Sequence, residues 1–304
     1  MGREKGKKLE HITFWQQLEV SEFEDEAKVK LFFQGWQQNL QGGEPQAVIC
    51  LVHGLGEHSG RYREIAQFFS GCGFSLLSYD LYGHGRSSGQ RGTIPTYEFM
   101  ISSVEELVKT ADEKFPTTPL FLYGHSLGGN LALNYALRRK TAEIQGLIMT
   151  SPWLRLKQKP VLPLHLLANL IYKINPDFTL PNGIDSEDLS QSEETRQNYE
   201  EDELVHDRIS VRLFIDTARA GEWALENYDR LKLPLLLMHG DEDNITDPAA
   251  SRQLAEKLHE TAAKCQYIEY EGLQHELHNS PRGKEVLQQI ANFINSMINS
   301  KQSL

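Results

Sequence analysis

From residue 47 onward the chain alternates short apolar runs with longer stretches in which apolar residues recur about every 3.6 positions. Glycine, proline or aspartate bounds the runs, which is typical of buried strands that alternate with helices on a mostly parallel sheet. The expected strands are 47–52, 75–79, 120–123, 147–150, 235–238 and 267–270, and the expected helices are 61–69, 97–114, 127–139, 249–260 and 284–298. Two earlier segments, 11–18 and 28–33, flank the acidic stretch 21–26 and predict an opening hairpin. We therefore expect an α/β fold.

One stretch, residues 152–231, breaks this alternation, because it holds several prolines and the acidic patch 185–202 but no clear strand. We expect it to be a mainly helical cap, inserted in a core made of residues 1–151 and 232–304. Its segment 161–174 has apolar residues on every side of an expected helix, namely Leu162, Leu164, Leu166, Leu167, Leu170 and Ile171. Such a helix is either buried between core and cap, or is a lid that lines an acyl-chain tunnel or touches a lipid surface. The sequence leaves both alternatives open.

Charge, apolar runs and cysteine spacing argue against a nucleic-acid-binding, membrane-spanning or secreted protein. The formal net charge of −11 at pH 7 disfavours nucleic acid as a partner, because binding to a phosphate backbone needs a basic surface. The longest apolar run, 47–52, is far too short to span a membrane. No apolar stretch follows the basic residues 1–8, so we expect no secretory signal. The 3 cysteines lack metal-type spacing, and we expect them to be thiols in a reducing cytoplasm.

Residues 124–128, with the sequence GHSLG, fit the pattern G-x-S-x-G, in which a sharp strand-to-helix turn exposes a serine hydroxyl. An expected strand ends directly before this motif and an expected helix begins within it, which is the structural context that the motif requires. A serine hydroxyl is a weak nucleophile until a base takes its proton. As a candidate nucleophile, Ser126 therefore needs a histidine and a carboxylate that orients this histidine.

Candidates for these two partners follow the last two expected strands. Asp241, Glu242 and Asp243 come after the first of them, and His275 and His278 come after the second. The chain order serine, acid, histidine is the order found with this motif, so both loops are in the expected place. The pattern does not decide between the acidic residues or between the histidines.

Attack on a carbonyl creates an oxyanion, which needs preorganised N–H donors. We expect one donor from Leu127, the residue after the serine, and the other from Leu55 in the glycine-lined segment 53–56. This segment does not fit a dinucleotide fingerprint, because Ser59 stands where the third glycine belongs. The histidines of these loops lack a third ligand at metal-type spacing. We therefore expect neither a dinucleotide nor a metal, and no cofactor.

Three blocks extend the motif into a longer pattern: HGLGEHSGRY at 53–62, DLYGHGRSSG at 80–89 and GHSLGG at 124–129. Together they resemble the monoacylglycerol lipases and the related lysophospholipases. The resemblance runs from about residue 32 to residue 294 and is looser across 152–231. It implies an α/β-hydrolase fold, with a mostly parallel eight-stranded sheet flanked by helices and a helical cap inserted after the sixth strand.

The same resemblance implies roles for the candidate residues. The acid would be Asp243, and the base would be His275, the first histidine of His-x-x-His. The implied activity is hydrolysis of a monoacylglycerol or lysophospholipid ester through an acyl-enzyme. Eukaryotic members carry alanine where Leu55 stands and cysteine where Thr246 stands, so the acyl and head-group preference does not carry over.

The resemblance also implies contacts with the hydroxyl groups of glycerol, from Glu57, Arg61 and His278 and from a cap tyrosine that matches Tyr199. The expected partner is a small lipid ester, and the expected location is the cytoplasm, with transient contact to membranes through the cap. Two alternatives remain: another hydrolase on the same triad, such as a prolyl aminopeptidase or a perhydrolase, and a binding protein that kept the fold without catalysis.

Overall fold

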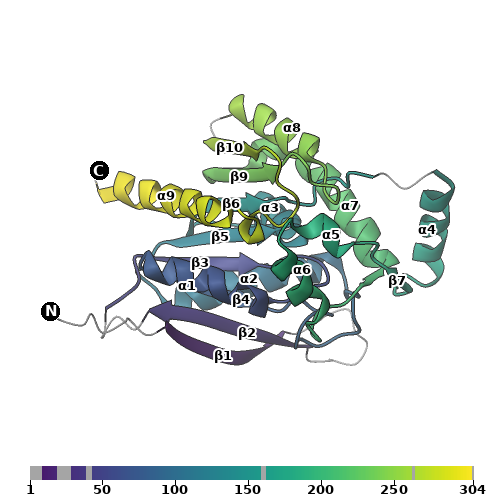
Figure 1. Cartoon of the computed structure of the whole chain (residues 1–304), viewed down its shortest axis with the longest axis horizontal. Helices are drawn as coiled ribbons and strands as arrows, with labels where there is room; N and C mark the ends of the chain where they lie inside the picture. Colours follow the sequence, from purple (N-terminus) through teal and green to yellow (C-terminus); the bar gives the residue numbers. More distant parts are fainter. Residues whose placement is uncertain (1–8, 19–28, 39–42, 159–161, 262–263, 303–304) are drawn as a thin grey trace.

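The computed structural model describes residues 9–18, 29–38, 43–158, 162–261 and 264–302 (Figure 1). Its main element is an 8-stranded sheet with the strand order β1-β2-β4-β3-β5-β6-β9-β10. These strands are β1 Leu9–Leu18, β2 Val29–Gln38, β3 Ala47–Val52, β4 Phe74–Tyr79, β5 Leu120–His125, β6 Ile144–Thr150, β9 Leu235–Gly240 and β10 Cys265–Tyr270. β1 and β2 form the expected antiparallel hairpin, and β2 also pairs antiparallel with β4. The remaining pairs of this sheet, along the order β4-β3-β5-β6-β9-β10, are parallel. The expected sheet is confirmed, while residues 1–8 and the acidic stretch 21–26 lie outside the described residues.

Alternate side chains of the central strands enter two separate cores. In β3, Val48 and Cys50 belong to one core, whereas Ile49 and Leu51 belong to the other. The first face is covered by α2 Tyr97–Lys114, α3 Leu127–Arg138 and α8 Pro248–His259, and the second by α1 Arg63–Gly71 and α9 Gly283–Gln302 (Figure 1). Because both faces are covered, β3, β4, β5 and β9 are buried along their whole length rather than at alternate positions.

The helix expected at 61–69 begins differently. Residues Ser59–Tyr62 form a 3₁₀ turn, η1, and the α-helix begins only at Arg63. The side chain of His58 fixes the start of η1, because its Nδ1 accepts a hydrogen bond from the N–H of Gly60 at 3.1 Å and so caps the 3₁₀ turn. This turn places Arg61 next to the loop that follows β3.

Between β6 and β9 the chain leaves the sheet and forms the expected insertion after the sixth strand (Figure 1). It contains α4 Leu162–Ile174, β7 Thr179–Pro181, α5 Ser186–Leu189, α6 Glu193–Glu200, β8 Arg208–Ser210, α7 Val211–Glu226 and the 3₁₀ turn η2 Tyr228–Arg230. The sequence shows no clear strand in this insertion, but the structure contains two, β7 and β8, which pair antiparallel. Each of them has only 3 residues, too few for a recognisable pattern. The boundaries of the insertion at 152 and 231 stay a prediction.

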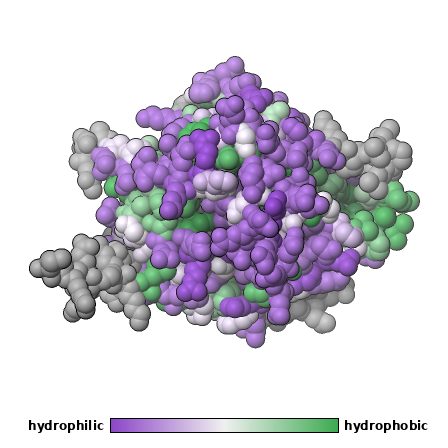
Figure 2. Space-filling view, viewed as in Figure 1, coloured by the Kyte–Doolittle hydropathy of each residue, from purple (hydrophilic) through white to green (hydrophobic). Residues whose placement is uncertain are grey.

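Three large apolar side chains in the described part of α4 are exposed, whereas Ile171 and Tyr172 are half-buried. The side chains of Leu167, Leu170 and Ile174 are 50%, 55% and 76% exposed. Figure 2 shows apolar surface at the right-hand edge, where α4 lies in Figure 1. Of the two alternatives for this helix, burial between core and cap is therefore wrong for Leu167, Leu170 and Ile174. In the part of the chain that the structure describes, no helix has both the length and the hydropathy needed to cross a membrane.

Candidate active site

Ser126 lies at a sharp turn between β5 and α3, with φ 54° and ψ −117°. Such a positive φ is strained for a residue other than glycine. The turn is held on both sides, since the Ser126 N–H donates to the carbonyl of Thr150 at 3.1 Å and its carbonyl accepts from Trp153 at 2.9 Å. A Cβ atom at Gly124 would collide with the carbonyl of Gly128. The strand and helix can therefore approach this closely only because glycine occupies the position.

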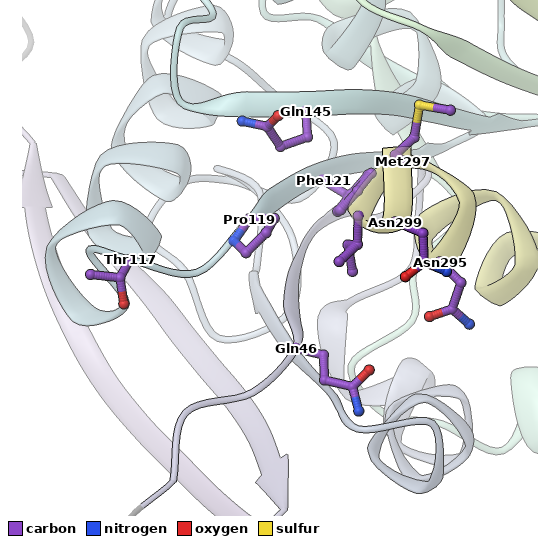
Figure 3. A pocket seen from close by; sticks show the side chains of 9 residues that line it. Gln46, Thr117, Pro119, Phe121, Gln145, Asn295, Met297 and Asn299 are labelled. Atoms are coloured by element: carbon purple, nitrogen blue, oxygen red, sulfur yellow. The ribbon is translucent and has the colours of Figure 1, made fainter. Parts of the chain in front are cut away.

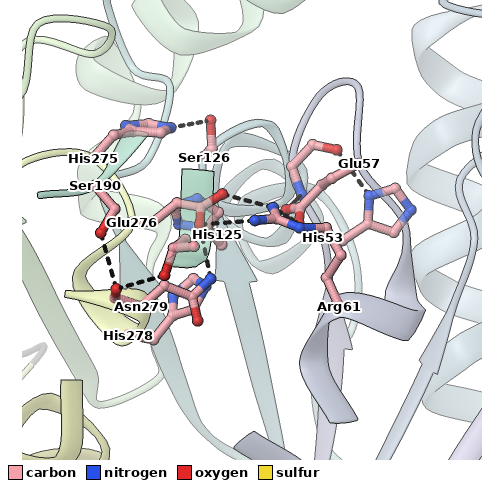
Figure 4. A network of polar contacts seen from close by, with 12 residues as sticks. His53, Glu57, Arg61, His125, Ser126, Ser190, His275, Glu276, His278 and Asn279 are labelled. Atoms are coloured by element: carbon pink, nitrogen blue, oxygen red, sulfur yellow. Dashed lines mark hydrogen bonds and ion pairs between the residues drawn. The ribbon is translucent and has the colours of Figure 1, made fainter. Parts of the chain in front are cut away.

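Three side chains from separate loops meet at this turn. Nε2 of His275 lies 2.9 Å from Oγ of Ser126, and Nδ1 of His275 lies 2.7 Å from Oδ2 of Asp243. Figure 4 shows the imidazole of His275 directed at the hydroxyl of Ser126. Ser126 follows β5, Asp243 follows β9 and His275 follows β10, so all three lie at the carboxyl ends of parallel strands. All three residues are buried.

The surroundings of Asp243 distinguish it from the other acidic residues in its turn. Its Oδ2 accepts from His275, from Nε2 of His239 at 3.0 Å and from Oγ1 of Thr246 at 2.8 Å, and its Oδ1 accepts from two backbone N–H groups. Burial alone would raise the pKa of Asp243, but the charge of His275 and these hydrogen bonds outweigh it and hold the pKa well below its ordinary value. Asp241 is exposed and accepts from the N–H of Gly272 instead.

The two candidate histidines have different environments. Burial lowers the pKa of His275, but the charge of Asp243 and its hydrogen bond outweigh this effect, so the pKa is raised. Burial lowers the pKa of His278 to about 4. Its ring packs against those of Tyr62 and His125 at 5.2 and 4.9 Å between centroids. The structure thus brings His275, and not His278, to the serine.

The expected oxyanion donors belong to two loops near Ser126. Leu127 is the first residue of α3, and the first N–H groups of a helix have no partner within it. Leu55 lies in the loop after β3, where the N–H of Gly54 donates to Oε1 of Glu57 at 2.6 Å and fixes the backbone. Leu55 and Ser126 line the same cavity. Both donors stay predictions.

This cavity is small, with a volume of about 10 Å³, and has a polar end. Glu57, Arg61 and Tyr199 line it as expected, but His278 does not, so its contact with glycerol stays a prediction. Nη1 of Arg61 donates to Oε2 of Glu57 at 2.9 Å, and its guanidinium lies 4.9 Å from the ring centroid of Tyr199. Glu276, for which the sequence pattern predicts no role, also lines the cavity.

Sequence reasoning also assigned no role to Ser151. This residue has φ 46°, and its Oγ donates to the carbonyl of His275 at 2.7 Å, so it supports the loop of the histidine. One signal could have found it, because Ser151 directly follows β6 at the same edge of the sheet as the other site residues. His239 and Thr246, which hold Asp243, lie near this edge as well, since His239 is next to the last residue of β9 and Thr246 is in the loop that follows it.

A larger cavity lies at the opposite ends of the strands, and Figure 3 shows its lining side chains. They are Gln46, Thr117, Pro119, Phe121, Gln145, Asn295, Met297, Ile298 and Asn299. None of these lining residues can act as an acid, a base or a strong nucleophile. The cavity at Ser126 is therefore the better candidate for chemistry. Among the described residues, no group of three or more His, Cys, Asp or Glu side chains is arranged to hold a metal ion.

Comparisons with known proteins place this geometry in context. The family model Hydrolase_4, described as serine aminopeptidase S33, matches residues 43–282. The monoacylglycerol lipase of Mycolicibacterium smegmatis is 30% identical over 271 residues, which cover 88% of this chain and 93% of that protein. An uncharacterized abhydrolase domain-containing protein of Dictyostelium discoideum is 33% identical over 260 residues, which cover 86% of this chain but only 27% of that protein. The crystal structure of Paleococcus ferrophilus monoacylglycerol lipase matches with a TM-score of 0.76 and 32% identity, and covers 95% of this chain and 99% of that chain.

Proposed function

The chain belongs to the Hydrolase_4 family of α/β-hydrolases and is a carboxylic ester hydrolase, and we propose that it cleaves monoacylglycerols into a fatty acid and glycerol. The observation that carries this proposal is the line of hydrogen bonds from Asp243 through His275 to Ser126, beside a cavity with a polar end. The relatives from Mycolicibacterium smegmatis and Paleococcus ferrophilus, both named monoacylglycerol lipases, support an ester substrate.

In the proposed mechanism, His275 takes the proton of Ser126 while Oγ attacks the ester carbonyl. Asp243 holds the imidazole in the required tautomer and stabilises the imidazolium that forms. The N–H groups of Leu55 and Leu127 would bind the oxyanion. The protonated His275 then returns its proton to the leaving glycerol, and a water molecule, activated by the same histidine, releases the fatty acid from Ser126.

The charges around the cavity favour a neutral head group. Glu57 and Glu276 place two carboxylates against the single guanidinium of Arg61, which leaves one formal negative charge uncompensated. A phosphate group at this place would be repelled by that charge. The hydroxyl groups of glycerol can instead donate hydrogen bonds to carboxylate oxygens. We therefore favour a monoacylglycerol over a lysophospholipid.

The exposed apolar side chains of α4 support a second part of the proposal. Soluble proteins rarely expose several large apolar side chains next to one another. Besides Leu167, Leu170 and Ile174, the exposed group includes Phe178 and Leu180, which follow α4 in the chain. We propose that this surface contacts lipid aggregates or membranes for a short time, and so brings the cavity near substrates of low solubility.

A panel of two lipids with one acyl chain each and a prolyl arylamide tests the proposal. We expect monooleoylglycerol to be hydrolysed at least about 10-fold more efficiently than oleoyl lysophosphatidic acid, and we expect no cleavage of a prolyl arylamide. The Ser126→Ala protein is the blank, and a fluorophosphonate probe should label the wild-type serine but not this variant. Preference for the arylamide would favour a peptidase, and absence of labelling would favour a binding protein.

A further inference from the structure

A buried carboxylate, that of Glu276, directly follows the proposed base and takes no part in the proton transfers described above. Its two oxygen atoms accept hydrogen bonds from Nη1 and Nη2 of Arg61, at 2.6 and 3.0 Å. Nδ2 of Asn279 donates to Oε2 at 2.7 Å. The backbone N–H of Glu276 donates to the carbonyl of Leu189 in the insertion at 2.8 Å. Glu276 is thus held by contacts on several sides.

Arg61 continues this network to the loop after β3. The same Nη1 atom that contacts Glu276 also donates to Oε2 of Glu57, and Oε1 of Glu57 accepts from the N–H of Gly54. Gly54 immediately precedes Leu55, the proposed oxyanion donor. Figure 4 shows Arg61 between the carboxylates of Glu57 and Glu276. One buried guanidinium therefore joins the loop of the base to the loop of the oxyanion donor.

Such a link has a geometric consequence. An arginine that makes two parallel hydrogen bonds with a carboxylate fixes both the distance and the orientation of its partner. The reaction at the serine requires that the base and the oxyanion donors are in place at the same time. A shift of about 1 Å in one of these groups can lower the rate 100-fold. We propose that Glu276 is a positioning residue. Through Arg61 it holds the loop of His275 and the loop of Leu55 in one arrangement, and this inference rests on the proposed function.

The charge of Glu276 supplies a readout that a purely structural role would not. The charged or titratable side chains around His275 include those of Asp243, Glu276, Glu57, Arg61, His125 and His278. The negative charge of Glu276 acts in the same direction as that of Asp243 and raises the pKa of His275. Its removal should lower this pKa. Because the base must be neutral to accept a proton, the acid limb of kcat/KM should then move to lower pH.

The test uses Glu276→Gln, which keeps the shape of the side chain and removes its charge. With p-nitrophenyl butyrate, a substrate without glycerol, we expect kcat to fall about 10-fold with a smaller change in KM, and the acid limb to move to lower pH. The matched control is Glu285→Gln on α9, which removes the same charge from an exposed ion pair with Arg282. This control should change neither kcat nor the pH profile.

Two outcomes would overturn the inference. One is a Glu276→Gln protein whose kcat stays within about twofold of the wild type and whose acid limb does not move. If Glu276→Gln does not fold, Asn279→Ala replaces it in the test, because this change removes a donor to Glu276 and keeps the charge of Glu276. The second outcome that would overturn the proposal is an unchanged kcat of this Asn279 variant. A wild-type protein that a fluorophosphonate does not label at Ser126 would instead overturn the proposed function itself.

Discussion

At the scale of single residues, Asp243 and Asp241 show what decides between two similar side chains. They stand two positions apart after the same strand, and spacing alone did not separate them. Their environments differ, since Asp243 is buried and accepts from His239 and His275, whereas Asp241 is exposed. Only the folded chain brings both histidines to Asp243, because His239 lies in β9 and His275 lies in the loop after β10.

We predict that Asp243→Asn lowers kcat about 10⁴-fold, because the amide can present its N–H to His275 and favour the wrong tautomer. Asp241→Asn, the matched control, should stay within about threefold of the wild type, since its side chain contacts a backbone N–H at the surface. Steady-state hydrolysis of p-nitrophenyl butyrate by both variants measures this. A larger loss in the Asp241 variant would mean that the acid is misassigned.

For the group of Glu57, Arg61 and Glu276, we predict that loss of the cation costs more free energy of unfolding than loss of one carboxylate charge. Arg61→Met would leave two carboxylates buried without a cation, and breaking a buried pair in this way costs about 3–5 kcal/mol. Glu276→Gln leaves the pair of Arg61 and Glu57 intact, so its cost should be smaller, about 1–3 kcal/mol. Urea unfolding of both variants at pH 7 measures the two values. Equal losses would show that the buried charges do not determine the stability of this group.

At the scale of helices and strands, periodicity predicted the elements that have a regular apolar face. The helix expected at 97–114 coincides with α2, and Thr96 fixes its start because its Oγ1 accepts from the N–H of Phe99 at 3.1 Å. The environment of α4 could not be predicted, because a helix with apolar residues on every side suits either a buried or an exposed position. The sequence does not tell what lies next to it.

The exposed face of α4 predicts a role with long-chain substrates. Replacing Leu170 and Ile174 by serine should lower binding to phosphatidylcholine vesicles and hydrolysis of monooleoylglycerol about 10-fold, because less apolar surface enters the lipid. Hydrolysis of p-nitrophenyl butyrate should not change. Trp15→Ser is the matched control, since Trp15 is 53% exposed on the edge strand β1. Equal effects of both changes on vesicle binding would contradict a specific role of α4.

At the scale of the whole molecule, the site was predictable as far as it depends on the sheet. Each member of the proposed triad follows a strand, and the carboxyl ends of parallel strands meet at one edge. A strand pattern and a motif therefore predicted the serine and the two loops of its partners, but not which residue of each loop is the acid or the base. The pairing of Arg61 with Glu276 was not predictable, because the two residues are 215 positions apart and belong to no repeating pattern. The same holds for contacts between the insertion and the loop of His275.

These contacts predict that the insertion is not uniformly stable. Near α5, the carbonyl of Leu189 accepts from Glu276, Oγ of Ser190 donates to the carbonyl of Asn279 at 2.9 Å, and Nε2 of Gln191 donates to the carbonyl of Gly272 at 2.6 Å. The described part of α4 instead exposes its apolar side chains.

Amide hydrogen exchange reports such local differences in stability. We predict slow exchange in peptides that cover residues 186–200, close to that of the core helix α3, and fast exchange in peptides that cover 167–178. The amide of Glu276 should be among the slow ones, because its partner Leu189 belongs to the half of the insertion that is bound to the core. Uniform exchange across the insertion would show that it moves as one body, and that the hydrogen bonds near α5 do not anchor one half of it to the site.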